Sequence, residues 1–304
     1  MDKKKSVFGE PMNKKDSSFY SKNDSNKPKK KDKNEDIIFN PANPRCSLSQ
    51  VILPEHTIIE VENLLAKITY HRKLYEEWGL NEIDSKGKKL VFNLYGLPGT
   101  GKSMLAEALV KELKTKIIRI SYASLESKFV GETSKNIEKA FESAKSSNSV
   151  LFFDEADSIL GKRMTSVTTA GDHAVNVSRA TMLMQLEDFS GIVMFATNLA
   201  KNFDPAFRRR ISSHIEIPVP DSEGRKALWE IKIPKSMPGK SDISIELLSK
   251  KSKGFTGAEI QNAVIKGATS AVQREGEKQV LLIDDLLKAI EIEKRTKEDI
   301  GSPH

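Results

Sequence analysis

The stretch that decides the fold is KKLVFNLYGLPGTGKSMLAEALVKEL, residues 88–113. Its first part, 88–96, is an apolar run that ends in glycine, which predicts a buried strand. Its last part, 103–113, repeats leucine every four residues, which predicts one apolar face of a helix. Between them lies GLPGTGKS, residues 96–103, which fits G-x-x-x-x-G-K-[ST]. A strand before this loop and a helix after it favour a phosphate-binding loop over a plain glycine-rich turn.

The residue types of this loop suit a nucleoside triphosphate and its metal ion. The glycines permit backbone angles that let successive N–H groups curl around a phosphate. Lys102 supplies a full positive charge to the β- and γ-phosphates, and Ser103 offers a hydroxyl to Mg²⁺. The residues of the loop that we expect to contact ATP are Gly96, Pro98, Gly99, Thr100, Gly101, Lys102, Ser103 and Met104.

Carboxylates follow another apolar run, SVLFFDEAD, residues 149–157. In open α/β sheets, ligands bind at the carboxyl ends of the strands. Adjacent side chains on a strand point to opposite sides, so two neighbouring carboxylates can take different roles. We assign Asp154 to Mg²⁺ and Glu155 to polarising the attacking water. Asp157 favours a helix cap or a salt-bridge partner over a third catalytic acid.

A further strand, GIVMFATN at 191–198, also ends in a polar residue. Read alone, Asn198 is typical of a turn. Beside the two motifs above, its amide is predicted to orient the attacking water, because an amide both donates and accepts hydrogen bonds.

Strands and helices alternate through the first two thirds of the chain. A strand is also expected at 115–121 and a helix at 134–147. This alternation predicts an α/β fold, a parallel P-loop NTPase sheet with helices on both faces. After about residue 218 the strand patterns stop, and turn residues separate four helical segments, which predict a small all-helical lid domain at 221–234, 243–254, 256–276 and 282–295.

The N-terminal region differs from the rest in composition. Residues 1–36 hold 11 lysines and 7 acidic residues, so +4 of the formal net charge of +7 belongs to them. We expect a disordered, Lys-rich tail at 1–46, the large ATPase domain at 47–217 and the helical lid at 218–300. The basic run at 27–33 is read as a solvated tail, with a nuclear address or a nucleic-acid contact as the alternative.

The composition limits the cellular compartments in which we expect the protein. Cys46 is the one cysteine, which excludes an internal disulfide and favours a reducing compartment. The sequence contains no apolar run near the roughly 20 residues that span a bilayer, and its first residues lack the apolar core of a signal peptide. We therefore expect a cytoplasmic protein, or a nuclear one if the source is eukaryotic, with no membrane partner.

GLPGTGKS, LFFDEAD and ATN, in this order and ahead of a helical domain, resemble Walker A, Walker B and sensor 1 of the AAA branch of the AAA+ ATPases. The resemblance covers roughly residues 47–295, and katanin, spastin and related single-ring members show the same run of motifs. It implies an Mg²⁺-dependent ATPase with ATP as the bound nucleotide.

The same resemblance extends to the two sides of the adenine. GFTGAEI, residues 254–260, is similar to the sensor 2 region of this branch, which implies that Gly257 and Ala258 lie near adenine and ribose. Val51 and Ile52 are expected to contact adenine from the other side, although their segment lacks the family's usual glycine-bearing motif.

FDPAFRRRI, residues 203–211, resembles the stretch that carries the family's arginine fingers. We expect Arg209 and Arg210 to act on a neighbouring subunit's nucleotide and Arg208 to be structural. A basic surface patch or pairing with carboxylates is the alternative. Fingers in trans imply an active site at a subunit interface, and therefore an ATP-promoted homo-oligomeric ring, in this family usually a hexamer.

SKFVGE, residues 127–132, matches the position of the family's pore loop. The match implies that Lys128, Phe129 and Val130 contact substrate in a central pore, whereas a buried core phenylalanine is the alternative. A second pore loop is expected within 161–179, with Arg163 and His173 as contributors.

These features together predict a ring motor that spends ATP on remodelling, unfolding or threading a protein substrate, in company with a separate adaptor or protease. The alternative is a nucleic-acid motor or loader that uses the basic N-terminal tail. A third reading is a switch module in which ATP controls assembly alone. Glu155 and Asn198 disfavour it, because a module that does not hydrolyse ATP needs neither residue.

Overall fold

The core of the protein is a parallel sheet with five strands in the part of the chain that the structure describes. The structure is a computed structural model, and it describes residues 38–84, 89–125, 132–161, 170–198, 203–276 and 279–300. The strand order is β2-β3-β4-β1-β5, and every neighbouring pair is parallel. The strands are β1 (Leu90–Tyr95), β2 (Ile117–Ser121), β3 (Val150–Asp154), β4 (Ile192–Thr197) and β5 (Ser213–Glu216).

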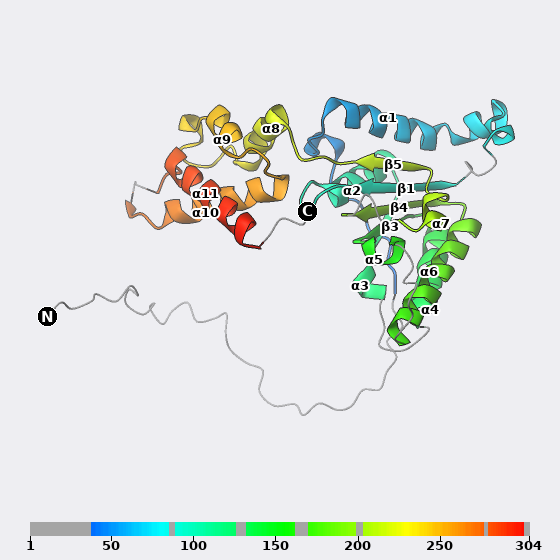
Figure 1. Cartoon of the computed structure of the whole chain (residues 1–304). Helices are drawn as coiled ribbons and strands as arrows, with labels where there is room; N and C mark the ends of the chain where they lie inside the picture. The colour runs from blue at the N-terminus through cyan, green and yellow to red at the C-terminus, as the bar shows by residue number, and fades with distance from the viewer. Residues whose placement is uncertain are drawn as a thin grey trace. The chain divides into compact units, whose positions relative to one another are not determined.

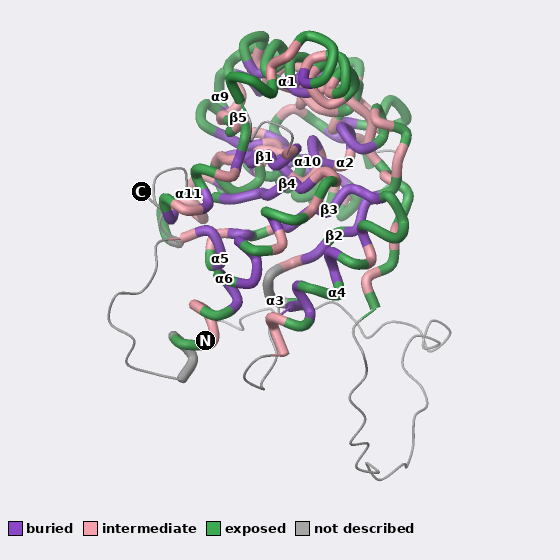
Figure 2. Tube along the Cα trace, turned by 90° about the vertical axis from the view of Figure 1, so that its right-hand side faces the viewer, coloured by how far each residue is buried: buried purple, intermediate pink, exposed green. Residues whose placement is uncertain are grey.

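Helices cover both faces of this sheet, as the apolar strand sequences predict (Figure 1). Alternate strand residues enter two separate apolar clusters. Val91 and Phe153 pack with α4 (Glu132–Ser147) and α6 (Ala170–Asp188) on one face. Phe92 on the other face packs with helices α1 (Glu55–Thr69) and α2 (Lys102–Glu112). Figure 2 shows the buried segments following the strands and the helix faces against them.

The short elements of this domain connect the layers and lie mostly at their edges. They are η2 (Leu48–Gln50), η3 (Lys73–Glu77), η4 (Leu80–Glu82), α3 (Tyr122–Leu125), α5 (Asp157–Leu160) and α7 (Pro205–Arg208). Of these, α5 follows β3 directly and so stands near the carboxyl end of that strand, whereas α7 lies between β4 and β5 in the chain. That edge of the sheet is where ligands of open α/β folds bind.

The second domain consists of helices around one apolar cluster. Its elements are α8 (Ser222–Lys232), η5 (Lys240–Asp242), α9 (Ile245–Lys251), α10 (Gly257–Val272) and α11 (Ile283–Ile300). Trp229 is fully buried at its centre, and the indole N–H donates to Ser252 Oγ at 2.9 Å. Asp221, Ser244 and Thr256 cap α8, α9 and α10 with side-chain hydrogen bonds. The four helical segments predicted from the sequence are all present.

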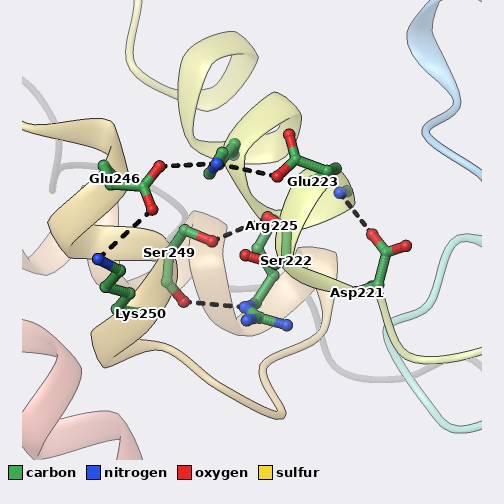
Figure 3. A network of polar contacts seen from close by, with 9 residues as sticks. Asp221, Ser222, Glu223, Arg225, Glu246, Ser249 and Lys250 are labelled. Carbon is green, nitrogen blue, oxygen red and sulfur yellow. Dashed lines mark hydrogen bonds and ion pairs between the residues drawn. The ribbon is translucent and has the colours of Figure 1, made fainter.

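A polar network joins α8 to α9 (Figure 3). The buried Arg225 donates from Nε to the carbonyl of Ser249 at 3.0 Å and from Nη1 to the carbonyl of Pro220 at 2.9 Å. Lys226 pairs with Glu223 and Glu246, and hydrogen bonds to these carboxylates raise the pKa of Lys226 to about 12. Arg225 therefore ties the segment that enters the lid to its second helix.

Three features of the fold differ from the sequence-based expectations. First, β5 was not predicted as a strand. Its four residues pair with β1 at the edge of the sheet, and this run is too short to show a clear pattern. Second, the polar stretch expected to be a loop at 161–179 enters helix α6 at Ala170, so His173 lies on a helix and is exposed. Arg163 is outside the described residues.

The third difference is the start of the folded unit. The chain joins the body at Ile38 and not near residue 47, because the residues in between contact the sheet and its helices. Phe39 packs against the apolar cluster that contains α4, and its carbonyl accepts a hydrogen bond from Ser143 Oγ at 2.6 Å. Ala42 and Ile117 exchange two backbone hydrogen bonds of 2.8 and 2.9 Å. The predicted tail of 1–46 is therefore too long by nine residues, 38–46.

None of the helices in the described part of the chain combines the length and the apolar character needed to cross a bilayer.

Candidate active site

The loop between β1 and α2 has a backbone that requires glycine. Gly96 has φ +152°, and a Cβ there would lie 2.2 Å from the carbonyl oxygen of Ile217. Gly99 has φ +78°, and a Cβ there would lie 2.8 Å from the Cβ of Ala258 in the lid. The N–H of Ala258 also donates to the carbonyl of Gly99 at 3.2 Å. The loop therefore touches the lid directly, with no room for a side chain between them.

Lys102 begins α2 and is buried within the loop. Its Nζ donates to the carbonyls of Gly96 at 2.9 Å and Leu97 at 3.0 Å, and to Asn198 Oδ1 at 2.8 Å. Burial lowers the pKa of Lys102, while the charges of Asp157 and Asp154 oppose that shift. The ammonium thus lies under the loop, where it joins the end of β1 to the end of β4.

Asp154 ends β3 opposite the first turn of α2. Its Oδ2 accepts from Ser103 Oγ at 2.8 Å, which brings together the two residues predicted to bind Mg²⁺. Its Oδ1 accepts from the backbone N–H of Glu155 at 3.1 Å. Glu155 is exposed and has φ +54°, a left-handed backbone that is strained for a residue with a side chain and that clusters at functional sites.

Asn198 follows β4 and is held by Asp157. The backbone N–H of Asn198 donates to Asp157 Oδ1 at 2.8 Å, and its amide Nδ2 lies 3.5 Å from Asp157 Oδ2. These contacts turn the amide oxygen toward Lys102. The sequence context favours a helix cap or a salt-bridge partner for Asp157. In the structure Asp157 has a more specific role, because it positions Asn198 at the end of the neighbouring strand β4.

A cavity of about 450 Å³ connects these groups with the lid. The predicted ATP contacts Val51, Ile52, Gly257 and Ala258 line it, as do all the loop residues predicted to contact ATP except Gly96. Asp154, Glu155 and Asn198 line it too. The cavity is also lined by residues that no sequence motif indicates, which are Gln50, Leu53, Pro54, Arg119, Ala196, Pro218, Pro220, Asp221, Gly224, Leu228, Lys232 and Gln261.

Among these additions, Arg119 brings a charge to the site. It lies on β2, where its neighbours Ile118 and Ile120 are buried and its own side chain is half exposed. Its Nη2 lies 2.5 Å from Asp154 Oδ2. The available signal in the sequence is an arginine between two isoleucines of a predicted strand. Burial raises the pKa of the nearby Cys46 thiol, and the Glu107 carboxylate raises it further.

The two predicted finger residues, Arg209 and Arg210, and their neighbour Arg208 differ in their surroundings. Arg208 and Arg209 are exposed at the end of α7, and their guanidinium groups form no hydrogen bond or ion pair with other described residues. Arg210 is partly buried, where its Nη1 donates to the carbonyl of Ala206 at 3.0 Å and its Nη2 pairs with Glu187. A role for Arg210 on another subunit therefore requires it to leave Glu187.

The predicted pore residues Lys128, Phe129 and Val130 lie outside the described residues. The described chain ends before them at Leu125 in α3 and resumes at Glu132 in α4. The choice between a pore residue and a core residue for Phe129 stays a prediction.

Comparison with known proteins places this site in a family. Residues 92–219 match the family "ATPase family associated with various cellular activities (AAA)". The chain is 35% identical over 216 residues to a proteasome-activating nucleotidase of Saccharolobus islandicus, covering 68% of this chain and 54% of the relative. The chain is 33% identical over 254 residues to the proteasome-activating nucleotidase of Saccharolobus solfataricus, covering 81% of this chain and 62% of the relative. It is 31% identical over 244 residues to that of Methanopyrus kandleri, covering 78% of this chain and 54% of the relative.

The chain thus spans between 54% and 62% of the length of these relatives. They do not test the narrower resemblance to katanin and spastin. The matched segment begins in β1, contains the phosphate loop and the ends of β3 and β4, and reaches the start of the lid. These residues are the ones that meet around the cavity, and the chain belongs to the AAA+ ATPases.

Proposed function

We propose that this protein hydrolyses ATP with Mg²⁺ and uses the energy to remodel protein substrates. The observation that carries the proposal is the meeting of Lys102, Ser103, Asp154 and Asn198 in one cavity that the lid also lines. Phosphoryl transfer needs positioning and charge stabilisation more than covalent chemistry. A buried lysine, a hydroxyl, a carboxylate and an amide on one sheet edge supply both.

The loop fits a chain of phosphates on two grounds. Gly99 and Gly101 have φ of +78° and +103°, so the backbone adopts a curled form that exposes N–H groups. The N-terminal end of α2 adds the positive end of a helix dipole at the same place. Lys102 would give up its carbonyl partners in the loop to reach the β- and γ-phosphates.

The metal would be held by Ser103 Oγ and Asp154, whose oxygens already lie 2.8 Å apart. A bound Mg²⁺ supplies charge neutralisation for the phosphates and the leaving group. Glu155 is our candidate for accepting the proton of the attacking water, because it is exposed to the cavity next to Asp154. Asn198 orients that water, while Asp157 fixes the orientation of Asn198.

The arginine stretch supports an oligomeric site. Arg208 and Arg209 are exposed and so are available to a neighbouring copy. We propose that Arg209 completes the active site of that copy, with Arg210 joining it after exchange of its Glu187 partner. Repeated head-to-tail contacts of this kind close into a ring. Proteasome-activating nucleotidases are among the relatives that the chain matches, so a protease ring is the partner class that we propose first.

The proposed substrate is an extended protein chain, gripped by Phe129 with Lys128 and Val130 beside it. A ring of apolar side chains contacts a peptide without regard to sequence, which suits an unfolding motor. The single cysteine agrees with a reducing compartment, so we place this activity in the cytoplasm.

The test is Glu155→Gln, which keeps the shape of the side chain and removes its basicity. We expect loss of ATP hydrolysis with retained ATP binding, and co-purification of protein substrate in the presence of ATP. Phe129→Ala should keep ATP hydrolysis and lose substrate unfolding. Undiminished hydrolysis by Glu155→Gln would contradict the catalytic assignment, and undiminished unfolding by Phe129→Ala would contradict the pore.

A further inference from the structure

The guanidinium of Arg119 occupies the place beside Asp154 where a positive charge is needed. Its Nη2 lies 2.5 Å from Asp154 Oδ2, and its Nη1 lies 3.6 Å from Glu107 Oε1. Its guanidinium carbon lies 6.0 Å from the centre of the Phe152 ring. Both carboxylate side chains are only 14% exposed, whereas Arg119 is 51% exposed. A half-exposed cation thus bridges two nearly buried anions.

Asp154 has no oxygen free of hydrogen-bond donors. Oδ2 accepts from both Arg119 and Ser103, and Oδ1 accepts from the N–H of Glu155. A divalent cation that binds Ser103 and Asp154 meets the guanidinium on the same carboxylate oxygen. Two positive groups on one oxygen repel each other, and partial burial strengthens the repulsion. The guanidinium and the metal ion therefore compete for Asp154.

Glu107 offers the displaced guanidinium a second partner. It lies on α2, one turn after Ser103, and its Oε2 is fixed by the backbone N–H of Arg45 at 2.9 Å. Because its Oε1 already lies 3.6 Å from Arg119 Nη1, a small rotation of the arginine side chain moves its charge from Asp154 to Glu107.

We propose that Arg119 is an internal counter-ion that neutralises Asp154 in the metal-free site and moves to Glu107 when a divalent cation binds. The inference rests on the proposed Mg²⁺–ATP site and adds to it a control over the order of binding. With Asp154 neutralised, a metal-free triphosphate enters without facing a bare carboxylate. Metal ions alone then bind weakly, because they must displace the guanidinium.

The proposal predicts opposite effects for two substitutions. Arg119→Gln removes the competing charge, so the nucleotide-free protein should bind Mn²⁺ roughly three- to fivefold more tightly, the scale of a partly exposed ion pair. Glu107→Gln keeps an acceptor for Arg45 and removes the second anion. It should weaken Mn²⁺ binding, because the guanidinium then stays on Asp154.

The experiment titrates Mn²⁺ against the full chain and follows the free ion by electron paramagnetic resonance. A second titration measures the affinity for a fluorescent ATP analogue with Mn²⁺ and with EDTA. Arg119→Gln should lose affinity for the analogue in EDTA by about threefold, since Asp154 then repels the phosphates. Arg72→Gln is the matched control, because Arg72 forms an exposed ion pair with Glu76 away from the cavity.

Two outcomes separate this inference from the proposed function. If the wild-type protein binds the analogue and Arg119→Gln binds Mn²⁺ no more tightly than Arg72→Gln does, the counter-ion role is overturned and the ATP site stands. If wild type binds the analogue neither with Mn²⁺ nor in EDTA, the proposed function itself fails. Tighter Mn²⁺ binding by Arg119→Gln together with weaker binding by Glu107→Gln supports the exchange.

Discussion

At the scale of single residues, Gly99 links the phosphate loop directly to the helical domain, because its carbonyl accepts a hydrogen bond from the N–H of Ala258. A Cβ at Gly99 would lie 2.8 Å from the Cβ of Ala258 and 2.9 Å from Thr256 Oγ1. Gly254 has nearly the same backbone, φ +81° against +78°, and open space where its Cβ would be. The two glycines therefore separate backbone strain from crowding.

We expect Gly99→Ala to be more destabilising than Gly254→Ala. Both variants carry the left-handed backbone cost of about 1 kcal/mol or more, and Gly99→Ala adds overpacking of about 1–3 kcal/mol. The measurement is denaturant unfolding of both variants, together with their affinity for an ATP analogue, which should fall in Gly99→Ala alone. Equal losses of stability would show that the lid yields freely to the added methyl group.

The arginines after α7 give a second prediction. Arg209→Ala should change stability by less than about 0.5 kcal/mol, as surface substitutions do, and should abolish most ATP hydrolysis. Arg210→Ala should lose about 1 kcal/mol of stability through its pair with Glu187, in addition to any loss of activity. The measurements are thermal unfolding and ATP hydrolysis.

Mixing Arg209→Ala with Lys102→Ala subunits tests whether the finger acts in trans. An oligomer that contains both has some interfaces with an intact lysine on one side and an intact arginine on the other. Recovery of hydrolysis in the mixture is the expected result, and each variant by itself is the control. Absence of any recovery would place Arg209 outside the neighbouring site.

At the scale of elements, the end of α10 is fastened to the start of α11 by one ion pair. Arg274 contacts Asp285 through two hydrogen bonds of 2.8 Å, and the N–H of Leu282 donates to the same carboxylate at 2.9 Å. The hydrogen bond from Arg274 is the main cause that lowers the pKa of Asp285 below 3.8. The carboxylate is thus charged in both the folded and the unfolded chain at neutral pH.

Asp285→Asn should cost about 1.5–3 kcal/mol of stability, the range for hydrogen bonds to charged groups. Because the folded pKa is the lower one, this contribution is complete above the unfolded value of 3.8 and is lost as pH falls through the folded value. Denaturant unfolding of wild type and variant should therefore give a constant difference near neutral pH that shrinks below 3.8. Asp284→Asn, at the exposed neighbouring position, is the control and should change little.

Most elements could be predicted from the sequence, and the exceptions have physical reasons. Strands β1, β3 and β4 are mostly apolar on both faces, so their sequences are easily recognised as buried strands. Strand β5 has only four residues, and two of its side chains are exposed. Helix α6 begins in a polar, glycine- and threonine-containing segment whose pattern is typical of a loop. In the site, the motifs indicate the phosphate loop and the carboxylates, but Arg119 reaches Asp154 only because β2 lies beside β3. No spacing in the sequence reveals that neighbourhood.

At the scale of the whole molecule, the position where the folded unit begins can be tested by truncation. A chain that starts at residue 47 lacks the two backbone hydrogen bonds between Ala42 and Ile117 and the packing of Phe39. Compared with a chain that starts at 38, it should be less stable by about 3 kcal/mol, from hydrogen bonds and apolar burial together.

The measurement is the free energy of unfolding of both truncated chains in denaturant. Phe39→Ala in the full chain is the companion variant, and it should account for part of the difference. Equal stability of the two truncated chains would show that residues 38–46 do not stabilise the folded unit and that it begins at residue 47.

The single cysteine makes the protein easy to equip with a spectroscopic reporter. Burial and then the nearby Glu107 carboxylate raise the pKa of Cys46, so little thiolate is present at neutral pH. A maleimide dye should therefore attach at this one sulfur, slowly at neutral pH and faster in alkaline buffer. Because Glu107 and Arg119 both act on this thiol, the dye would sense the charge that moves between the carboxylates. One labelled subunit would then report metal binding in real time, without any engineered cysteine.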